Sequence, residues 1–357
     1  MTFFYIVAAI ALFGILITVH EAGHFFAARL MNIPVREFAI GFGPRLLKWK
    51  SKKHETQFFL RAIPLGGYCA FYGEDDTSEA SKDDPRAFSR HSVLKRLLTI
   101  LMGPVMNLLL ALLAAVMLYT FSGIPVASGP SVTIVQSVAD GGAAKAAGLL
   151  AGDLIVSVDG ELVTDNLSAL IAQAAGSAPR ARQFVVERKV DGAASQVQLP
   201  VTPVYDPVEG RSLIGIMMAI SQPVEMVPGS ITEVFKSAVT LSYQAGAMVF
   251  TAIGNLFRGQ GLGEVTGVVG ITSMIVEEIR RTQLEGYLYL MVVISINLGL
   301  MNLLIIPGLD GSRIAFLLLE AVRGKPIKKE AYVHLAGMVL LFALMIFITF
   351  RDVVRLF

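Results

Sequence analysis

Long apolar runs constrain this chain more than any other feature of its sequence. A helix that crosses a lipid bilayer needs about 20 mostly apolar residues, and several stretches of the chain meet that length. Hydrophobic residues make up 54% of the 357 residues and charged residues only 16%, so the composition lies outside that of soluble enzymes. We therefore predict a polytopic α-helical membrane protein with about four transmembrane helices. The predicted spans are 1–28, 93–121, 285–319 and 332–351.

Basic residues indicate how these spans are oriented. Thirteen Lys or Arg residues lie between Arg29 and Arg96, and five more lie between Arg313 and Lys329. By the positive-inside rule both segments are cytoplasmic, which makes 29–92 a cytoplasmic loop and puts both termini outside. Because the net charge is only +2 and the basic residues flank apolar runs, nucleic-acid binding is not expected.

Residues 226–283 allow two interpretations. The segment 231–257 is apolar enough to span a bilayer, yet its apolar residues recur at helical spacing with polar residues opposite them. An additional crossing here would reverse the span at 285–319 relative to the first span. We therefore predict amphipathic helices at the membrane interface over 226–283.

Residues 128–204 differ in character from the spans around them. Short β-branched runs alternate there with Gly and Asp turns, and the composition is that of a soluble protein. Because this segment follows a span that ends outside, we predict one inserted extracytoplasmic domain of the β-rich α+β class.

The first span carries a group of residues that can bind a metal. His20 and His24 are separated by one helical turn, so both imidazoles lie on the same face of a helix and can ligate one ion, while Glu21 lies beside it. A charged carboxylate near the bilayer centre costs about 2.5–3.5 kcal/mol, so residues of this kind are usually functional. The alternative is that these side chains only form hydrogen bonds to neighbouring helices or reach interfacial water.

A third ligand is needed if the metal is catalytic zinc, which has three protein ligands and an open position. Since Cys69 is the only cysteine, this ligand must be a histidine or a carboxylate. Asp310 ends an apolar run and is flanked by Pro307, Gly308 and Gly311, an irregular segment that membranes tolerate where it lines a cavity. Taken alone, it is more often a turn at the membrane surface.

At this point the sequence resembles the site-2 intramembrane metalloproteases, and more narrowly the bacterial regulator-of-sigma-E proteases. The matching motifs occur in the family's order across nearly the whole chain. One departure is visible, because Ile305 replaces the first proline of the family's Asn-x-x-Pro-x-Pro-x-Leu-Asp-Gly pattern, which leaves open whether the chain unwinds before Pro307. The motifs are His20-Glu21-x-x-His24, Gly41-Phe42-Gly43-Pro44, Gly103-Pro104-x-x-Asn107 and Asn302 to Gly311.

The resemblance implies an intramembrane zinc metalloprotease of the bacterial cytoplasmic (inner) membrane, with its active site toward the cytoplasmic side. It implies Zn²⁺ held by His20, His24 and Asp310, with Glu21 as the general base. The implied substrates are single-pass transmembrane proteins or signal-peptide-like segments, for example anti-sigma factors or remnant signal peptides. Asn302 would then contact substrate, and the alternative for it is an interhelical hydrogen bond worth about 1 kcal/mol.

Two further segments have predicted structures with open roles. Residues 57–63 and 67–72 are short β-prone runs separated by Pro64, Leu65 and Gly66, which predicts a membrane-associated β-hairpin. The hairpin could add a substrate strand to its edge or only anchor the loop to the membrane.

The Ala-Gly-Leu-x-x-Gly-Asp-x-Ile segment at 147–155 resembles a PDZ domain, which could bind a peptide, exclude bulky ectodomains or act as a spacer.

Two other classes of function are weaker. A membrane scaffold with a vestigial site is disfavoured, because such a site has no reason to retain four ionisable residues in lipid. A divalent-metal transporter is disfavoured because inverted repeats and paired broken helices are not visible in the sequence.

Overall fold

The computed structural model describes residues 2–52, 55–73, 84–164, 166–172, 180–190, 193–206, 211–259, 267–327 and 330–354. The chain forms two compact units, which are described separately. Unit 1 combines Met1–Gly123 with Pro228–Phe357, and unit 2 comprises Ile124–Val227.

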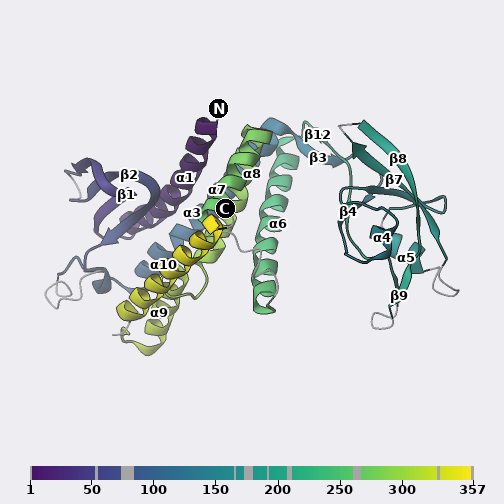
Figure 1. Cartoon of the computed structure of the whole chain (residues 1–357). Coiled ribbons are helices and arrows are strands. Elements are labelled where there is room, and N and C mark those ends of the chain that lie inside the picture. The colour runs from purple at the N-terminus through teal and green to yellow at the C-terminus, as the bar shows by residue number, and fades with distance from the viewer. Residues whose placement is uncertain are drawn as a thin grey trace. The chain divides into compact units, whose positions relative to one another are not determined.

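Unit 1 is built around long apolar helices. Among the described residues, four helices are long and apolar enough to cross a membrane, which agrees with the predicted number of spans. The helix α3 packs against both α1 and α8 (Figure 1). Glycine allows the close approach of α1, because a Cβ atom at Gly23 would lie 2.3 Å from the carbonyl oxygen of Met102. The four helices are α1 Thr2–Leu30, α3 Val93–Ser122, α8 Leu284–Asn302 and α10 Glu330–Val354.

The predicted single span at 285–319 is wrong, because the structure breaks it into two helices. The first, α8, ends at Asn302, and the second, α9, spans Asp310–Arg323. The chain leaves the helix at Leu303, before Pro307, so a second proline at Ile305 is not needed for unwinding. Gly308 supports the turn with a φ of 100°, a value that glycine adopts without a steric penalty.

The strands β1 (Val35–Lys50) and β2 (Gln57–Phe71) form one curled antiparallel sheet beside α1 (Figure 1). Each strand bends on itself, so that residues 35–40 pair with 67–71, residues 37–40 also pair with 57–60, and residues 57–61 pair with 45–50. The predicted pairing of 57–63 with 67–72 is therefore wrong, since both segments pair with β1.

Glycines produce these bends. Gly41, Gly43 and Gly66 have φ values of 85°, 82° and 134°, which L-residues rarely adopt. A Cβ atom at Gly41 would also lie 2.6 Å from the carbonyl oxygen of Ile63. As a result, the segment 67–71 is an edge of the curled sheet, and it faces the end of α1 that carries the histidines.

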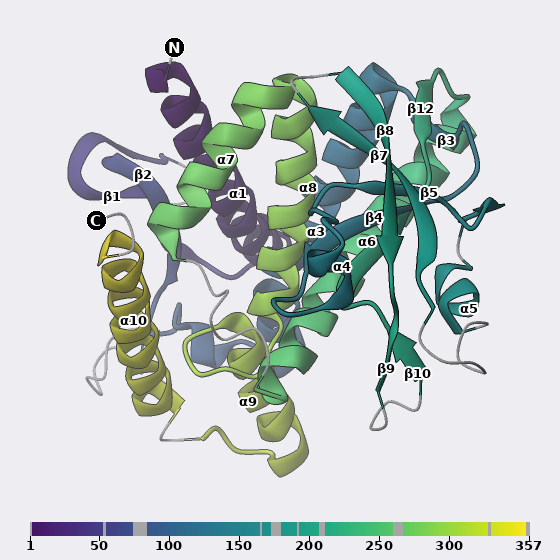
Figure 2. The ribbon, with the colours of Figure 1, turned by 45° about the vertical axis from the view of Figure 1, so that its right-hand side comes forward.

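The predicted interfacial region contains two helices, α6 (Ile231–Phe257) and α7 (Val268–Thr282). Figures 1 and 2 show α6 lengthwise beside α8, with α7 on the other side of α8. The buried residues of α6, Val234, Ala238 and Ala245, lie at helical spacing on one stripe. The amphipathic pattern therefore serves packing against α3 and α8, and the location of these helices at the membrane interface stays a prediction.

Unit 2 is a β-rich domain with a core of its own. The described strands form a six-stranded sheet in the order β11-β4-β5-β7-β8, with β6 paired to β5. Buried apolar side chains such as Leu149, Ile155 and Phe184 fill the space between this sheet and the short helices. The elements of this sheet and the helices beside it are β4 Val132–Val138, α4 Ala143–Ala146, β5 Leu154–Val158, β6 Glu161–Leu162, α5 Leu167–Ala172, β7 Arg182–Val190, β8 Ala193–Val201 and β11 Ile216–Ser221.

Unit 2 is larger than the predicted range of 128–204. Strand β11 pairs with β4 and lies at one end of the described sheet. Two-stranded pairs complete the unit, β9 (Val204–Asp206) with β10 (Arg211–Leu213) and β3 (Ile124–Ala127) with β12 (Val224–Val227). The sequence range missed β11 because its partner strand is about 80 residues away, so no local pattern joins them.

The Gly-Asp motif of unit 2 has a clear structural role. Gly148 and Gly152 have φ values of 84° and 92°, so this turn needs glycine at both positions. The Asp153 carboxylate is buried, and it accepts hydrogen bonds from the Leu150 amide at 2.9 Å and from Arg188 Nε and Nη2, each at 2.7 Å. This pairing raises the pKa of Arg188 further above its ordinary value and fixes the turn to β7.

Candidate metal centre

The metal centre begins with two imidazoles on one face of α1. His20 and His24 are 7% and 6% exposed, and their Nε2 atoms are 3.2 Å apart. The Nδ1 atom of His24 lies 3.0 Å from the backbone carbonyl oxygen of Thr99 on α3. A carbonyl oxygen only accepts hydrogen bonds, so this contact places the proton of His24 on Nδ1 and leaves Nε2 free to bind a metal.

Asn107 fixes the proton position of His20, as the Thr99 carbonyl oxygen does for His24. Its side-chain amide lies 3.2 Å from His20 Nδ1, in the orientation with Nδ2 toward the ring. Its Oδ1 atom is buried and has no hydrogen-bond partner among the described residues. A half-turn of this amide exchanges the two atoms, so that Oδ1 accepts the proton of His20 Nδ1 and Nε2 is left for the metal.

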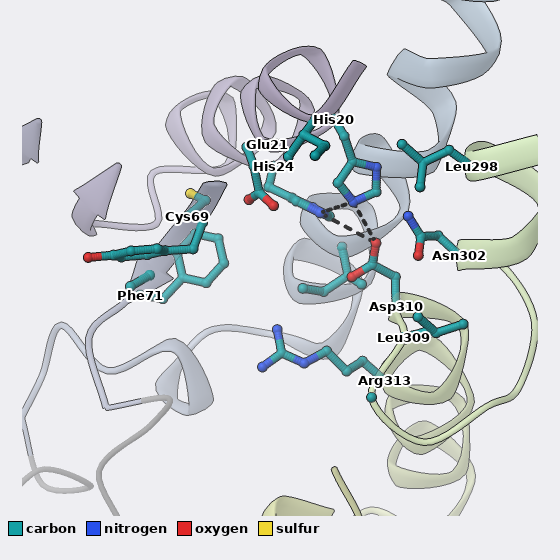
Figure 3. Close-up of a pocket in the computed structure, with 15 residues that line it drawn as sticks. His20, Glu21, His24, Cys69, Phe71, Leu298, Asn302, Leu309, Asp310 and Arg313 are labelled. Carbon is teal, nitrogen blue, oxygen red and sulfur yellow. Dashed lines mark hydrogen bonds and ion pairs between the residues drawn. The ribbon is translucent and has the colours of Figure 1, made fainter. Parts of the chain in front are cut away.

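Asp310 completes a triangle of ligand atoms. Its Oδ2 atom lies 3.1 Å from His20 Nε2 and 3.5 Å from His24 Nε2. Four ligands arranged tetrahedrally about 2.0–2.2 Å from zinc are about 3.4 Å from one another, so these separations fit one ion. Among the described residues, Asp310 Oδ2 also has no hydrogen-bond donor although it is buried, which fits a position reserved for a cation. Figure 3 shows the three side chains pointing toward one another.

Gly103 makes room for both imidazoles. A Cβ atom at this position of α3 would lie 2.3 Å from Nε2 and Cε1 of His24 and 3.0 Å from Cε1 of His20. Real Cβ atoms do not approach other atoms so closely, so any larger residue must displace the rings. The motif Gly103-Pro104-x-x-Asn107 thus combines the space for the two histidines with the partner of one of them.

A cavity of about 400 Å³ opens beside the three ligand residues. Glu21 and Asn302 both line it, and they lie on opposite sides of the ligand triangle (Figure 3). Arg313, one turn after Asp310 on α9, adds a permanent positive charge to the cavity wall. The lining residues are Ile17, His20, Glu21, His24, Tyr68, Cys69, Ala70, Phe71, Ile100, Leu298, Asn302, Gly308, Leu309, Asp310 and Arg313.

The edge segment of the curled sheet forms one wall of this cavity. Residues 68–71 line it, and Gly67 lies so close to α1 that a Cβ atom there would be 3.4 Å from Glu21 Cγ. Phe71 anchors this edge, because its ring stacks on Phe88 at 4.8 Å between centroids. The general-base candidate therefore lies between the ligand residues and the edge segment of the curled sheet.

Comparison with known proteins identifies the family. The profile of Peptidase family M50 matches residues 8–345. The chain is 30% identical to "Zinc metalloprotease RasP" of Geobacillus kaustophilus over 99% of this chain and 98% of the relative. It is 29% identical to "Regulator of sigma-W protease RasP" of Bacillus subtilis over 99% of each chain. It is also 30% identical to "Membrane metalloprotease ARASP, chloroplastic" of Arabidopsis thaliana, over 98% of this chain and 79% of that one.

The chain belongs to peptidase family M50. This confirms the predicted site-2 protease family, the predicted class of zinc metallopeptidase and the predicted Zn²⁺ cofactor. The apolar helices and the membrane metalloprotease relatives also make it a multi-pass membrane protein.

Within this M50 peptidase, the structure brings together all five residues predicted for the site. His20, His24 and Asp310 form the ligand triangle, and Glu21 and Asn302 line the same cavity. Sequence reasoning assigned no role to four other participants. Asn107 and Gly103 stood in a motif whose function was open, Thr99 acts only through its backbone, and Arg313 was counted only as a basic loop residue.

Proposed function

We propose that this M50 peptidase hydrolyses peptide bonds within or next to transmembrane segments, with zinc held by His20, His24 and Asp310 and with Glu21 as the general base. The ligand triangle carries this proposal, because two ligands lie on a helix able to span a bilayer and the third follows the break after another such helix. The cavity between them provides the open position that catalysis needs.

Zinc, when bound, lowers the pKa of its water molecule to about 7. Glu21 lines the cavity but does not belong to the ligand triangle, so its carboxylate would accept a proton from the water that adds to the scissile carbonyl carbon. The protonated carboxyl can then pass that proton to the leaving amine as the C–N bond breaks. We infer that Asn302, which lines the cavity across the triangle from Glu21, donates a hydrogen bond to the substrate backbone.

The edge segment 67–71 supports capture of the substrate as an extended strand. A transmembrane helix hides its peptide bonds in its own hydrogen bonds, so cleavage requires local unwinding. An unwound segment can add to the edge strand as a further strand, and this edge lines the cavity beside Glu21. N-methylation of substrate amides next to the scissile bond should then raise KM, whereas methylation several residues away should not.

The relatives and the membrane helices support the proposed substrate class. The name "Regulator of sigma-W protease" of the Bacillus subtilis relative supports a membrane-bound anti-sigma factor as one substrate, and remnant signal peptides share the same chemistry. The basic loops support a location in a bacterial inner membrane, with both termini outside and the active site toward the cytoplasmic side.

Unit 2 supports a PDZ-like role outside the cytoplasm. Strand β11 is at one end of the described sheet, and its side chains Met217 and Ile220 are 65% and 54% exposed. Such an edge can bind a peptide by strand addition. Alternatively, the unit excludes substrates with bulky ectodomains. Either peptide binding or exclusion would select substrates before they reach the metal centre.

The decisive test compares purified wild type, Glu21→Gln and Asp310→Ala on labelled transmembrane peptides. Glu21→Gln should retain about one zinc per chain and lose nearly all cleavage, because a neutral amide cannot accept the proton. Asp310→Ala should lose both zinc and cleavage. Glu285→Gln, at the exposed start of α8, removes the same charge from a helix without touching the cavity and should be fully active.

Three results would contradict this proposal. Cleavage that survives Glu21→Gln would remove the general-base assignment. A wild type that neither binds zinc nor cleaves any peptide would favour a scaffold, and zinc flux across proteoliposomes would favour a transporter.

A further inference from the structure

A cluster of cations lies on the curled sheet, on residues that do not line the cavity of the metal centre. Arg45, Lys48 and Arg61 all approach the ring of Phe59, at 4.6, 5.7 and 5.7 Å from its centroid. Phe59 is only 2% exposed, and the three cationic groups lie beside its ring. Three positive charges are therefore gathered on one face of a small sheet.

The repulsion between these cations favours a bound anion. Arg45 and Arg61 are directly opposite in the strand register, and like charges at such positions destabilise a sheet. Among the described residues, no ion pair joins Arg45 or Lys48 to an acid. The Arg61 guanidinium donates to Gly43 O and to Tyr68 Oη, and its Nε atom is buried without a partner in the described part of the chain.

Strand β1, which carries Arg45 and Lys48, also exposes large apolar side chains. Leu46, Leu47 and Trp49 are 61%, 58% and 50% exposed, and Trp49 stacks on Phe58 with a centroid separation of 5.2 Å. Exposed aliphatic and tryptophan side chains next to lysine and arginine are the composition of a surface that lies in the headgroup region of a bilayer. A soluble acidic partner would match the charges but leave the apolar residues in water.

We propose that Arg45, Lys48 and Arg61 form a binding site for the headgroup of an anionic phospholipid, while Leu46, Leu47 and Trp49 contact its acyl chains. The headgroup phosphate can accept hydrogen bonds from the guanidinium groups, which relieves the repulsion between Arg45 and Arg61. A zwitterionic lipid carries the same phosphate with a compensating cation, so the site prefers lipids of net negative charge. This preference does not depend on the proposed proteolysis.

The chain offers a direct probe, because Trp49 is its single tryptophan. The full-length protein is placed in phosphatidylcholine nanodiscs in which the same fraction of lipid is replaced by either brominated phosphatidylglycerol or brominated phosphatidylcholine. Bromine quenches tryptophan fluorescence only at short range. We expect stronger quenching by brominated phosphatidylglycerol, whereas equal quenching by the two lipids in wild type overturns the proposal regardless of how any variant folds.

Variants test whether the cationic cluster causes the preference for anionic lipid. Arg45→Gln/Lys48→Gln should reduce the ratio of the two quenching constants by about threefold or more. The charge-retaining Arg45→Lys/Lys48→Arg should leave this ratio unchanged. The matched control is Arg280→Gln/Arg281→Gln, because these two exposed guanidinium groups already pair with Glu277 and Glu278 and should leave the ratio unchanged. A ratio that persists in Arg45→Gln/Lys48→Gln, or that falls equally in the control, contradicts the site.

Discussion

The proton positions of His20 and His24 are set by α3, a different helix from the one that carries them. The Thr99 carbonyl and the Asn107 amide each contact an Nδ1 atom, so both Nε2 atoms converge on Asp310. Partners of this kind fix ring orientation and raise ligand basicity. Residues that never touch the metal should therefore change its affinity.

Asn107→Leu tests this at one residue. Leucine has similar volume but no group that can accept the proton of His20 Nδ1, so we expect zinc affinity to fall roughly 10- to 100-fold. Competition with a chelator measures this affinity directly. Unchanged zinc affinity in a folded Asn107→Leu protein would show that the contact at 3.2 Å does not orient His20.

Gly103→Ala tests the space around the rings. The added methyl would lie 2.3 Å from the His24 ring, and the resulting displacement should weaken zinc binding roughly 10- to 100-fold. The same substitution at Gly254 in α6 is a matched control, because no atom of the described residues lies within 4 Å of its Cβ position. Gly254→Ala should leave zinc binding unchanged and stabilise its helix by up to about 1 kcal/mol.

The sequence was sufficient to predict His20 and His24 as ligands, but not Thr99 and Asn107 as their hydrogen-bond partners, for a physical reason. The spacing of His20 and His24 is read from one helix, where geometry depends only on the helical period. Thr99 contributes a backbone atom, which leaves no trace in its side-chain type, and Asn107 acts only when α3 is placed against α1. Asp310 was reachable because a two-histidine site demanded a carboxylate from elsewhere in the chain.

At the scale of elements, the break between α8 and α9 is what brings Asp310 to α1. The helix α9 is held in place by an ion pair, because Arg96 of α3 donates to the Glu320 carboxylate through Nη1 at 3.1 Å and Nη2 at 2.5 Å. The two side chains are only 8% and 12% exposed. This pair and the core of Ala28, Phe71 and Leu317 fix the third ligand relative to the first two.

Glu320→Ala should therefore cost stability and displace the ligand. Loss of one partner leaves the Arg96 charge buried and unpaired, which costs about 3–5 kcal/mol, and zinc affinity should fall because α9 carries Asp310. The exchange Arg96→Glu/Glu320→Arg should restore part of the stability and part of the zinc affinity. Recovery is incomplete because the exchange removes the hydrogen bond from Arg96 Nε to His91 O. Thermal unfolding and chelator competition measure the two effects, and equal losses in the exchange and in Glu320→Ala would argue against the ion pair.

The strands show where sequence patterns stop being informative. Residues 57–63 and 67–72 look like the two arms of one hairpin, because Pro64, Leu65 and Gly66 between them are typical turn residues. The structure instead uses Gly41 and Gly66 to curl β1 and β2 around each other. Alternation within a strand does not distinguish these partners, since either pairing buries the same face.

At the scale of the whole molecule, the inserted unit and the membrane unit have separate cores. The sequence separated them through a change in composition, but it missed β11, whose partner is distant in the chain. The insertion is joined by one narrow stem, because β3 pairs with β12 so that Ile124 faces Val227 and Ala127 faces Val224. The ends of the insertion are therefore adjacent, and the unit can be removed without pulling α3 away from α6.

A chain in which a short Asn-Gly turn replaces residues 128–223 should thus retain the stem, bind zinc and cleave a short transmembrane peptide at the wild-type rate. Its substrate selection should change. If the unit excludes bulky ectodomains, a substrate with a folded ectodomain will be cleaved faster by the shortened chain than by wild type. If β11 recruits peptides by strand addition, the same substrate will show a raised KM with an unchanged kcat, and a chain with β11 edge substitutions such as Met217→Pro will reproduce this effect. Loss of zinc binding in the shortened chain would instead mean that the metal centre depends on the inserted unit for its folding.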